Sequence, residues 1–184
     1  MSISSEFDNH KDESEFVITA PTQYGHELAY RAKARMTLGV LVQLAAQSEK
    51  YFVISSPFIT SSNDERSKIL DISIFSALKK GVIVNVVSTG SGLEAFDISN
   101  KYKEFNNIHY FQPQINILNN KFLGSHAKFC LSDDMHAYIG SANLTGSGLF
   151  ENLEMGILIH GKLARQISEF WKSLIEMEFF VEVI

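Results

Sequence analysis

The 184-residue chain contains a single cysteine and only three prolines. One cysteine cannot form an internal disulfide, and it rules out metal sites built from several cysteines. Few prolines, with 45% hydrophobic and 20% charged residues, are typical of a compact folded protein and not of a disordered one. Because the chain has no disulfide, we expect a reducing, cytoplasmic environment.

The sequence also lacks a long apolar run. The most apolar helical stretch, Met36 to Ala46, has about half of the roughly 20 residues that a membrane-crossing helix needs. The first residues do not form a basic start followed by an apolar run, so no secretory signal is visible. We therefore expect no membrane partner.

Patterns of metal ligands are missing as well. No acidic cluster suggests a two-metal hydrolytic site, and most histidines are scattered without metal-ligand spacing. These scattered histidines are His10, His26, His109, His136 and His160. The sequence therefore predicts neither a metal nor a cofactor.

Strong positive charge is absent too. The net charge is −5, and residues 1–16 alone carry five acidic residues against one lysine. The other residues include 15 basic and 16 acidic ones, so the body of the chain is nearly neutral. A polyanionic partner must therefore bind a local patch. Arg31, Lys33 and Arg35 are one candidate patch, and a merely solvated helix face is the plainer interpretation.

Alternating extended and helical patterns predict one α/β domain over residues 21–184, after a flexible acidic tail over residues 1–20. Gly81 follows one helix where a C-terminal glycine is expected, and a polar loop is expected over 112–125. Strands are expected at 51–59, 82–87, 108–111, 126–131, 136–139 and 154–159, and helices at about 27–49, 69–80 and 162–177. A Gly/Ser turn at 89–92 is expected to lead into a further helix that ends at about residue 105. This order predicts a mixed, largely buried β-sheet with helices on both faces.

One segment, from Gly124 to Ile159, differs chemically from the others. Six residues of mixed chemistry lie within eighteen positions there, in the pattern His-x-Lys-(four)-Asp-(six)-Gly-Ser-x-Asn. They are His126, Lys128, Asp133, Gly140, Ser141 and Asn143, and Glu154 follows in Asn152-x-Glu154.

The spacing of this pattern suits a phosphodiester. Side chains two apart on a strand share a face, so His126 and Lys128 point together, as do Ser141 and Asn143 if their segment is extended. Lysine places a positive charge on phosphate oxygens, serine and asparagine supply hydrogen bonds, and imidazole can attack phosphorus. Two short segments would thus hold a phosphodiester at one spot.

The pattern resembles the signature of the phospholipase D superfamily, and the resemblance covers about residues 50–177. It implies metal-independent hydrolysis in two steps. One histidine attacks phosphorus to form a phosphohistidine while a second protonates the leaving oxygen, and water then completes the reaction. The implied catalytic residues are His126, Lys128, Asn143, Ser141, Glu154 and Asp133.

Plainer roles remain open for several of these residues. Asp133 has the opposite strand parity to His126, which favours bracing of a loop over contact with substrate. Glu154 is expected to fix the tautomer of the histidine, or else to be a solvated charge at a strand end. Ser141 and Asn143 could be turn residues, because Gly-Ser-x-Asn is typical of turns.

The signature occurs once, and the mechanism that it implies needs two histidines. A homodimer would supply them, because two-fold symmetry can bring His126 of both copies into one shared site. If each chain instead had its own complete site, His109 and His136 would be the first candidates for the second group.

Single-motif relatives of this size include bacterial nucleases and the catalytic parts of some restriction enzymes, so DNA is the favoured substrate of an expected endonuclease. One alternative is a phospholipase D or phosphatidyl transferase acting on lipid, although the interfacial apolar surface or anchor expected of it is not evident. Another is a non-catalytic subunit of a nucleic-acid-processing or defence complex.

Overall fold

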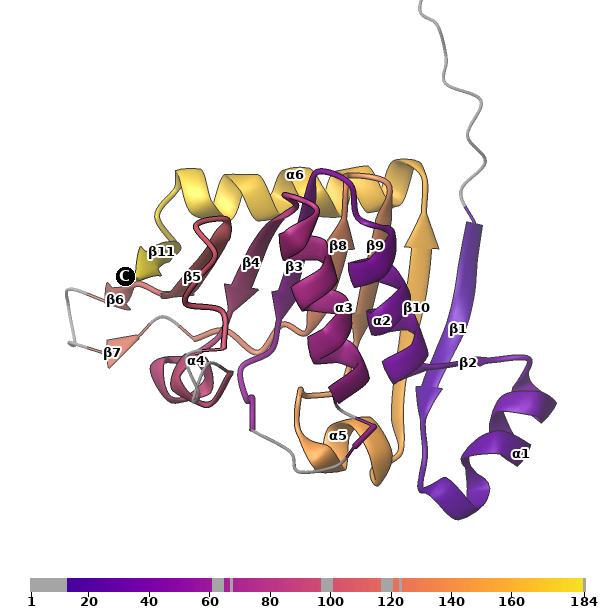
Figure 1. Cartoon of the computed structure of the whole chain (residues 1–184). Helices are drawn as coiled ribbons and strands as arrows, with labels where there is room; N and C mark the ends of the chain where they lie inside the picture. Colours follow the sequence, from indigo (N-terminus) through magenta and orange to yellow (C-terminus); the bar gives the residue numbers. More distant parts are fainter. Residues whose placement is uncertain are drawn as a thin grey trace, which may run out of the picture.

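The computed structural model describes residues 13–60, 65–66, 68–96, 101–116, 121–122 and 124–183. A nine-stranded sheet in the order β11-β5-β4-β3-β8-β9-β10-β1-β2 forms its centre (Figure 1). Its strands are β1 (Glu13–Thr19), β2 (Arg35–Met36), β3 (Tyr51–Ser55), β4 (Ile83–Val87), β5 (Ile108–Pro113), β8 (Phe129–Ser132), β9 (His136–Gly140), β10 (Glu154–His160) and β11 (Phe180–Val183). Neighbours β3, β4 and β5 are parallel, whereas β3, β8, β9, β10 and β1 alternate in direction.

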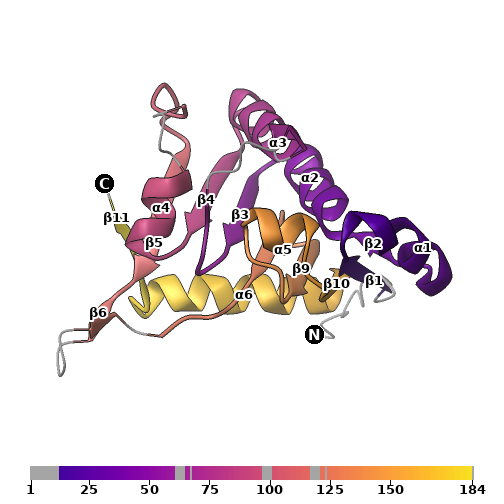
Figure 2. The same cartoon turned by 90° about the horizontal axis from the view of Figure 1, so that it is seen from below.

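Helices cover both faces of this sheet, as Figure 2 shows from below. The helices are α1 (Thr22–Ala32), α2 (Thr37–Gln47), α3 (Lys68–Lys79), α4 (Gly90–Phe96), α5 (Gly146–Phe150) and α6 (Lys162–Glu176). α2 and α3 pack on one face, and α6 crosses the other (Figures 1 and 2). The predicted mixed sheet flanked by helices on both faces is therefore confirmed.

The core explains why the central strands form where they do. In β3, Phe52 and Ile54 join the core under α2 and α3, while Val53 joins the core under α6. All three side chains are fully buried. A strand covered on both faces requires consecutive apolar residues, which the run that begins at Tyr51 supplies.

The expected tail over residues 1–20 is wrong for residues 13–20. Residues 13–19 form β1, which pairs antiparallel with β10 along its whole length. Val17 is fully buried, and Glu15 lies 3.5 Å from Arg35 and 3.3 Å from His160. Burial and strand pairing therefore outweigh the acidic composition that favoured a tail. Residues 1–12 lie outside the described part.

The single helix expected over 27–49 is also wrong. α1 ends at Lys33, which adopts the left-handed conformation with a φ of 50°. The chain then pairs Arg35 and Met36 with β1 before α2 begins at Thr37. Residue spacing predicted an unbroken helix because a left-handed lysine has no sequence signature as clear as that of glycine.

Smaller differences lie elsewhere in the chain. α4 ends at Phe96 and not near residue 105, and residues 97–100 lie outside the described part. The expected polar loop includes a short hairpin of β6 (Ile115–Asn116) and β7 (Lys121–Phe122). The short elements α5 and β11 were not predicted at all.

Two exposed glycines give a test of this backbone. A Cβ on Gly39 in α2 would meet no atom within 4 Å, and the same is true of Gly81, but Gly81 has a φ of +86°. We expect Gly39→Ala to raise the free energy of unfolding by about 0.5 kcal/mol, because alanine loses less entropy in a helix. Gly81→Ala should lower it by about 1 kcal/mol, because the Cβ is strained at that φ. Urea unfolding of both variants checks the pair, and equal effects would contradict it.

Candidate active site

The sequence pattern lies at one end of the central strands. β3 and β9 finish at this end, and β8 and β10 begin there, because the four strands alternate in direction. We call it the site end; it is the lower edge of the sheet in Figure 1. Lys128 precedes β8, Ser141 follows β9, and Glu154 opens β10. Three separate parts of the pattern thus converge.

His126 and Lys128 form the centre of the candidate site. The Lys128 Nζ lies 3.1 Å from the His126 Nδ1 and donates to the His126 carbonyl oxygen at 3.0 Å. An ammonium has only donors, so the imidazole nitrogen accepts. The predicted strand over 126–131 is wrong at its start, because β8 begins at Phe129. The two side chains nevertheless meet, as their spacing predicted.

Lys128 is an unusual cation because it is buried, with only 6% of the residue exposed. Burial lowers the pKa of its ammonium, and the negative charge of Glu154 opposes this shift. A partly desolvated ammonium interacts more strongly with a phosphate than one in water does. Lys128 is therefore suited to hold an anion at the site end.

Glu154 fixes Ser141 and not the histidine. The Ser141 hydroxyl donates to Glu154 Oε2 and accepts from the Met155 backbone N–H at 3.1 Å. Asn152 donates to the other carboxylate oxygen at 3.2 Å. Within the described residues no hydrogen bond joins Glu154 to His126, so the expected role in fixing the histidine tautomer finds no contact here. Glu154 instead orients the serine hydroxyl.

Ser56, which the sequence did not mark, connects β3 to the second half of the pattern. Its buried hydroxyl donates to the Phe58 carbonyl oxygen at 2.7 Å and accepts from the Leu144 N–H at 3.1 Å. The Ser56 hydroxyl donates its only proton to the Phe58 carbonyl oxygen. The 3.5 Å between this hydroxyl and the Asn143 Oδ1 is therefore a close contact and not a second hydrogen bond. Pro57 could have indicated from the sequence that the strand ends before it and that a connecting segment follows, because proline rarely lies inside a central strand.

Asp133 is not part of the site and is removed from the candidate catalytic residues. It follows the far end of β8, where its carboxylate accepts from the backbone N–H groups of Glu49, Lys50 and Tyr51 at 2.7, 2.8 and 2.9 Å. Its φ of 50° places it in a tight turn. The loop-bracing interpretation is the one that the contacts support.

Three other described histidines lie at the opposite end of the sheet from His126. His136 and His160 open β9 and close β10, at the end of the sheet opposite the site, and their Nδ1 atoms lie 2.7 Å apart. His109 lies near the start of β5 at that same end and contacts Glu182 at 2.7 Å. Neither His109 nor His136 can therefore complete a site around His126 within one folded chain.

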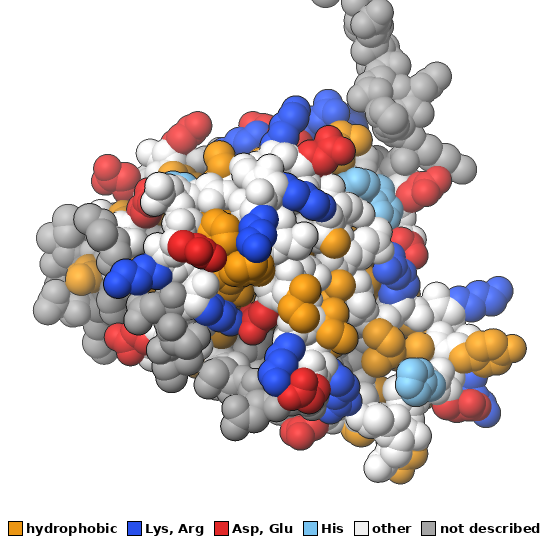
Figure 3. Space-filling model, in the orientation of Figure 1, with side chains coloured by type: hydrophobic (Ala, Val, Ile, Leu, Met, Phe, Trp, Pro, Cys, Tyr) orange, Lys and Arg blue, Asp and Glu red, His pale blue; other side chains and the backbone are white. Residues whose placement is uncertain are grey.

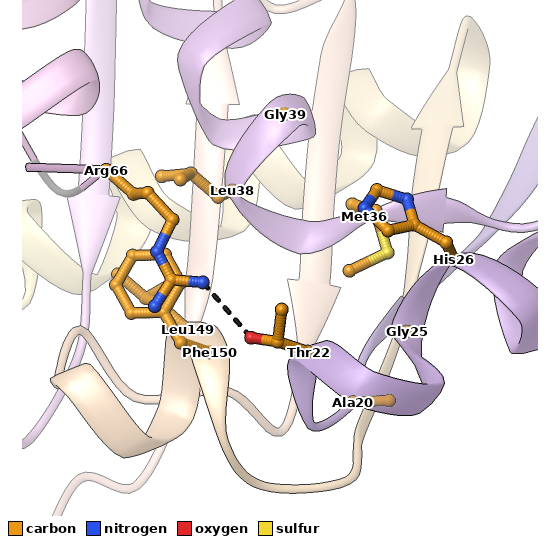
Figure 4. A pocket seen from close by; sticks show the side chains of 10 residues that line it. All are labelled: Ala20, Thr22, Gly25, His26, Met36, Leu38, Gly39, Arg66, Leu149 and Phe150. Atoms are coloured by element: carbon orange, nitrogen blue, oxygen red, sulfur yellow. Dashed lines mark hydrogen bonds between the residues drawn. The ribbon is translucent and has the colours of Figure 1, made fainter.

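A separate cavity of about 260 Å³ lies beside α5 (Figure 4). Leu149 and Phe150 of α5 line it, together with Arg66, whose guanidinium lies 4.1 Å from the centre of the Phe150 ring. The backbone of Asn143 lies so close to Gly148 that a Cβ there would be 2.4 Å from the Asn143 carbonyl oxygen. The short helix therefore packs against Asn143 and also lines the cavity.

Three further observations concern surface charge, metal ligands and membrane helices. On the face that carries α2 and α3, acidic and basic side chains are mixed (Figure 3). Among the residues that the structure describes, no group of three or more histidine, cysteine or acidic side chains could hold a metal ion. Over the same residues, no helix is long and apolar enough to span a bilayer.

Comparison with known families identifies this arrangement. A family model described as "Cardiolipin synthase, PLD-like domain" matches residues 41–177, which contain every pattern residue. The chain belongs to this phospholipase D-like family. The resemblance read from the spaced pattern is thereby confirmed.

One curated relative is a "DISARM protein DrmC" from Bacillus paralicheniformis, 25% identical over 175 residues. The match covers 92% of this chain and 66% of the relative, so the chain spans just under two thirds of that protein.

Solved structures share the phospholipase D-like fold. NucT from Helicobacter pylori superposes with a TM-score of 0.66 at 13% identity, covering 90% of this chain and 97% of NucT. Nuc from Salmonella typhimurium, a phospholipase D family member, gives 0.63 at 16% identity, with 94% and 99% covered. A phosphatidylserine synthase from Haemophilus influenzae gives 0.64 at 14% identity, with 94% of this chain but 40% of the synthase covered.

The role of Asp133 can be tested by separating stability from activity. We expect Asp133→Ala to lower the free energy of unfolding by about 1–3 kcal/mol, because N–H groups that it satisfies lose their acceptor. Any catalytic rate of the folded protein should stay within about twofold, because the described contacts of Asp133 lie at the end of β8 opposite the site. Urea unfolding and steady-state rates below the melting temperature measure the two effects. A large fall in rate without a fall in stability would return Asp133 to the catalytic residues.

Proposed function

We propose that this protein is a metal-independent phosphodiesterase that cleaves nucleic acid, with DNA as the favoured substrate. The observation that carries the proposal is the buried Lys128 ammonium held against the exposed His126 ring, with Ser141 and Asn143 at the same end of the sheet. A cation, hydrogen-bond donors and an imidazole nucleophile are the groups that phosphoryl transfer requires.

The proposed reaction has two steps. An imidazole nitrogen of His126 attacks phosphorus, the bond to the leaving oxygen breaks, and a second imidazolium protonates that oxygen. Water then attacks the phosphohistidine, giving its proton to the second imidazole, and the released His126 is restored. Lys128 and Asn143 stabilise the charge that develops on the non-bridging oxygens. One imidazole must start neutral and the other protonated, and such a pair titrates as a unit.

We propose that the second imidazole is the His126 of another copy of this chain. His109, His136 and His160 lie at the far end of the sheet and cannot reach the site, so we propose that a second chain completes the chemistry. An isologous dimer places identical surfaces around its axis and therefore brings two copies of the same residue together. The site would then be shared between the two subunits.

An exposed apolar surface beside the site end fits this dimer. Phe16, Ile139, Met155 and Ile157, here called the apolar patch, are 41%, 43%, 59% and 48% exposed. Ile157 pairs with Phe16 on one side and with Ile139 on the other, so the patch runs across three strands.

The apolar patch lies on the face that α6 covers only in part. Ile159, two residues along β10 from Ile157, is buried in the same cluster as Trp171 of α6. Met155 directly follows Glu154, so the patch is continuous with the site end. A contiguous apolar surface of this kind often marks an interface, and obligate dimer interfaces are more apolar than other surfaces.

The length of the matched structures favours DNA over lipid. NucT and Nuc match this chain almost end to end, whereas the phosphatidylserine synthase is much longer than the matched part. The alternative of a phospholipase D or phosphatidyl transferase uses the same phosphoryl chemistry, and vesicle assays distinguish it. A cytoplasmic location is part of this proposal.

A second candidate function has one observation in its favour. The similarity to a DISARM protein that is longer than this chain supports a subunit of a nucleic-acid-processing or defence complex. In its non-catalytic form this alternative predicts no activity of the isolated chain on any phosphodiester.

Cleavage assays with and without EDTA test the proposed activity. The substrates are plasmid, single-stranded DNA, RNA and labelled phospholipid vesicles. We expect DNA cleavage that survives EDTA, because Lys128 and Asn143 supply the stabilisation of charge. Lys128→Ala and Asn143→Ala should each lower the rate by about a hundredfold or more while the fold persists.

The matched control is Lys162→Ala, which removes an exposed lysine at the start of α6, after the end of β10 that lies opposite the site. It should cleave as the wild type does. Strict dependence on an added divalent ion would contradict the metal-independent mechanism. Activity on vesicles alone would mean that the substrate is a lipid and not DNA.

The shared site is tested through the apolar patch. We expect Ile157→Glu to yield monomers and to lower activity by at least about tenfold, because a buried, unpaired carboxylate opposes association. Ile72→Glu changes an isoleucine that is 66% exposed on α3, on the other face, and should leave both the mass and the activity unchanged. Light scattering gives the mass.

Mixed dimers complete this test. A dimer with His126→Ala in one subunit should be inactive, because the remaining imidazole lacks its partner. About half of the wild-type activity would mean independent sites, and a fully active monomer would end the dimer proposal.

A further inference from the structure

Phe58 is an exposed aromatic residue beside the proposed nucleophile. It is 56% exposed, and its ring centre lies 6.3 Å from that of His126, at an interplanar angle of 75°. The edge-on contact uses only part of the ring, and most of the apolar surface remains in solvent. A large aromatic side chain contributes most to stability when buried, so core packing does not explain this position.

The backbone around Phe58 is held firmly. Its carbonyl oxygen accepts from Ser56 at 2.7 Å, and the preceding Pro57 carbonyl oxygen accepts from Thr89 at 3.1 Å. Ile59 forms a bridge with Leu144, and the Thr60 N–H donates to the Leu144 carbonyl oxygen at 3.0 Å.

These contacts tie Phe58 to the same loop that carries Ser141 and Asn143. Pro57 also has a fixed φ, which limits the freedom of the segment. The ring is thus presented on a rigid support, in a constant position relative to His126. Rigid aromatic side chains lose little entropy when they bind a flat partner.

We propose that Phe58 forms the floor of a subsite for a nucleobase next to the scissile phosphate. The inference rests on the proposed phosphodiesterase function and adds the class of substrate. With phosphorus at His126, the nucleoside attached to it lies over the neighbouring Phe58 ring. Stacking of a base on an aromatic ring is favourable and depends little on sequence.

The subsite selects unpaired bases. In a duplex each base is already stacked on both sides, so contact with Phe58 requires the base to leave the stack, which costs free energy. A single strand meets no such cost. The substrate class is therefore single-stranded nucleic acid, or an unpaired region within a duplex.

The test compares two single-stranded oligonucleotides of equal length. One carries bases, and in the other every nucleotide is replaced by an abasic tetrahydrofuran residue, which keeps the phosphodiesters but removes the stacking partner. The measured quantity is the ratio of kcat/KM for the first to kcat/KM for the second. We expect a high ratio for the wild type and a fall of about tenfold or more in Phe58→Ala, mainly through KM. Phe58→Tyr should restore the ratio, because its ring also stacks.

Phe170→Ala is the matched control, because Phe170 is 63% exposed on α6, on the other side of the sheet, and its loss should leave the ratio at the wild-type value. An unchanged ratio in Phe58→Ala overturns the subsite while leaving the phosphodiesterase intact. Equal losses on single-stranded and duplex DNA would also overturn it. Wild-type activity on vesicles alone, or on no substrate, instead overturns the proposed function and the subsite with it.

Discussion

β3, β8, β9 and β10 lie side by side with alternating direction, and this hydrogen-bonded order places every group of the candidate site. The end of β3 brings Ser56 and Phe58 to the edge where β8 begins, and Lys128 lies there. The two remaining strand ends add Ser141 and Glu154. A slip of one residue in any of these pairings would turn alternate side chains to the other face and separate the groups.

Several residues at the site end are costly for stability. Lys128 is a buried cation whose pKa is lowered by burial, so its charged form is disfavoured in the fold. Phe58 and the apolar patch leave hydrophobic surface in water. Buried charges and exposed apolar side chains concentrate at functional sites. Here the buried Lys128, the exposed Phe58 and the apolar patch all lie at or beside one edge of the sheet. The proposed shared phosphodiester site would account for all three together.

The phospholipase D-like family gives the fold, and the surroundings of the proposed catalytic groups would decide the substrate. The same imidazole, ammonium and amide suit a lipid or a nucleic acid, because both contain a phosphodiester. We propose that Phe58 separates the two for this chain, because its exposed ring suits a local stacking contact with a single strand.

The sequence by itself determined the sheet with helices on both faces, because β-branched runs and helical spacing depend on local pattern. It also predicted the meeting of His126 with Lys128, although the strand that this prediction assumed begins only at Phe129. Strand parity already favoured loop bracing for Asp133, and tertiary structure decided its role by placing it at the far end of β8, where it accepts from the N–H groups of residues 49–51. It also decided that acidic residues 13–19 form a strand and that Glu154 holds Ser141. Each of these depends on contacts between residues distant in the chain, and the spacing within one segment carries no information about such partners.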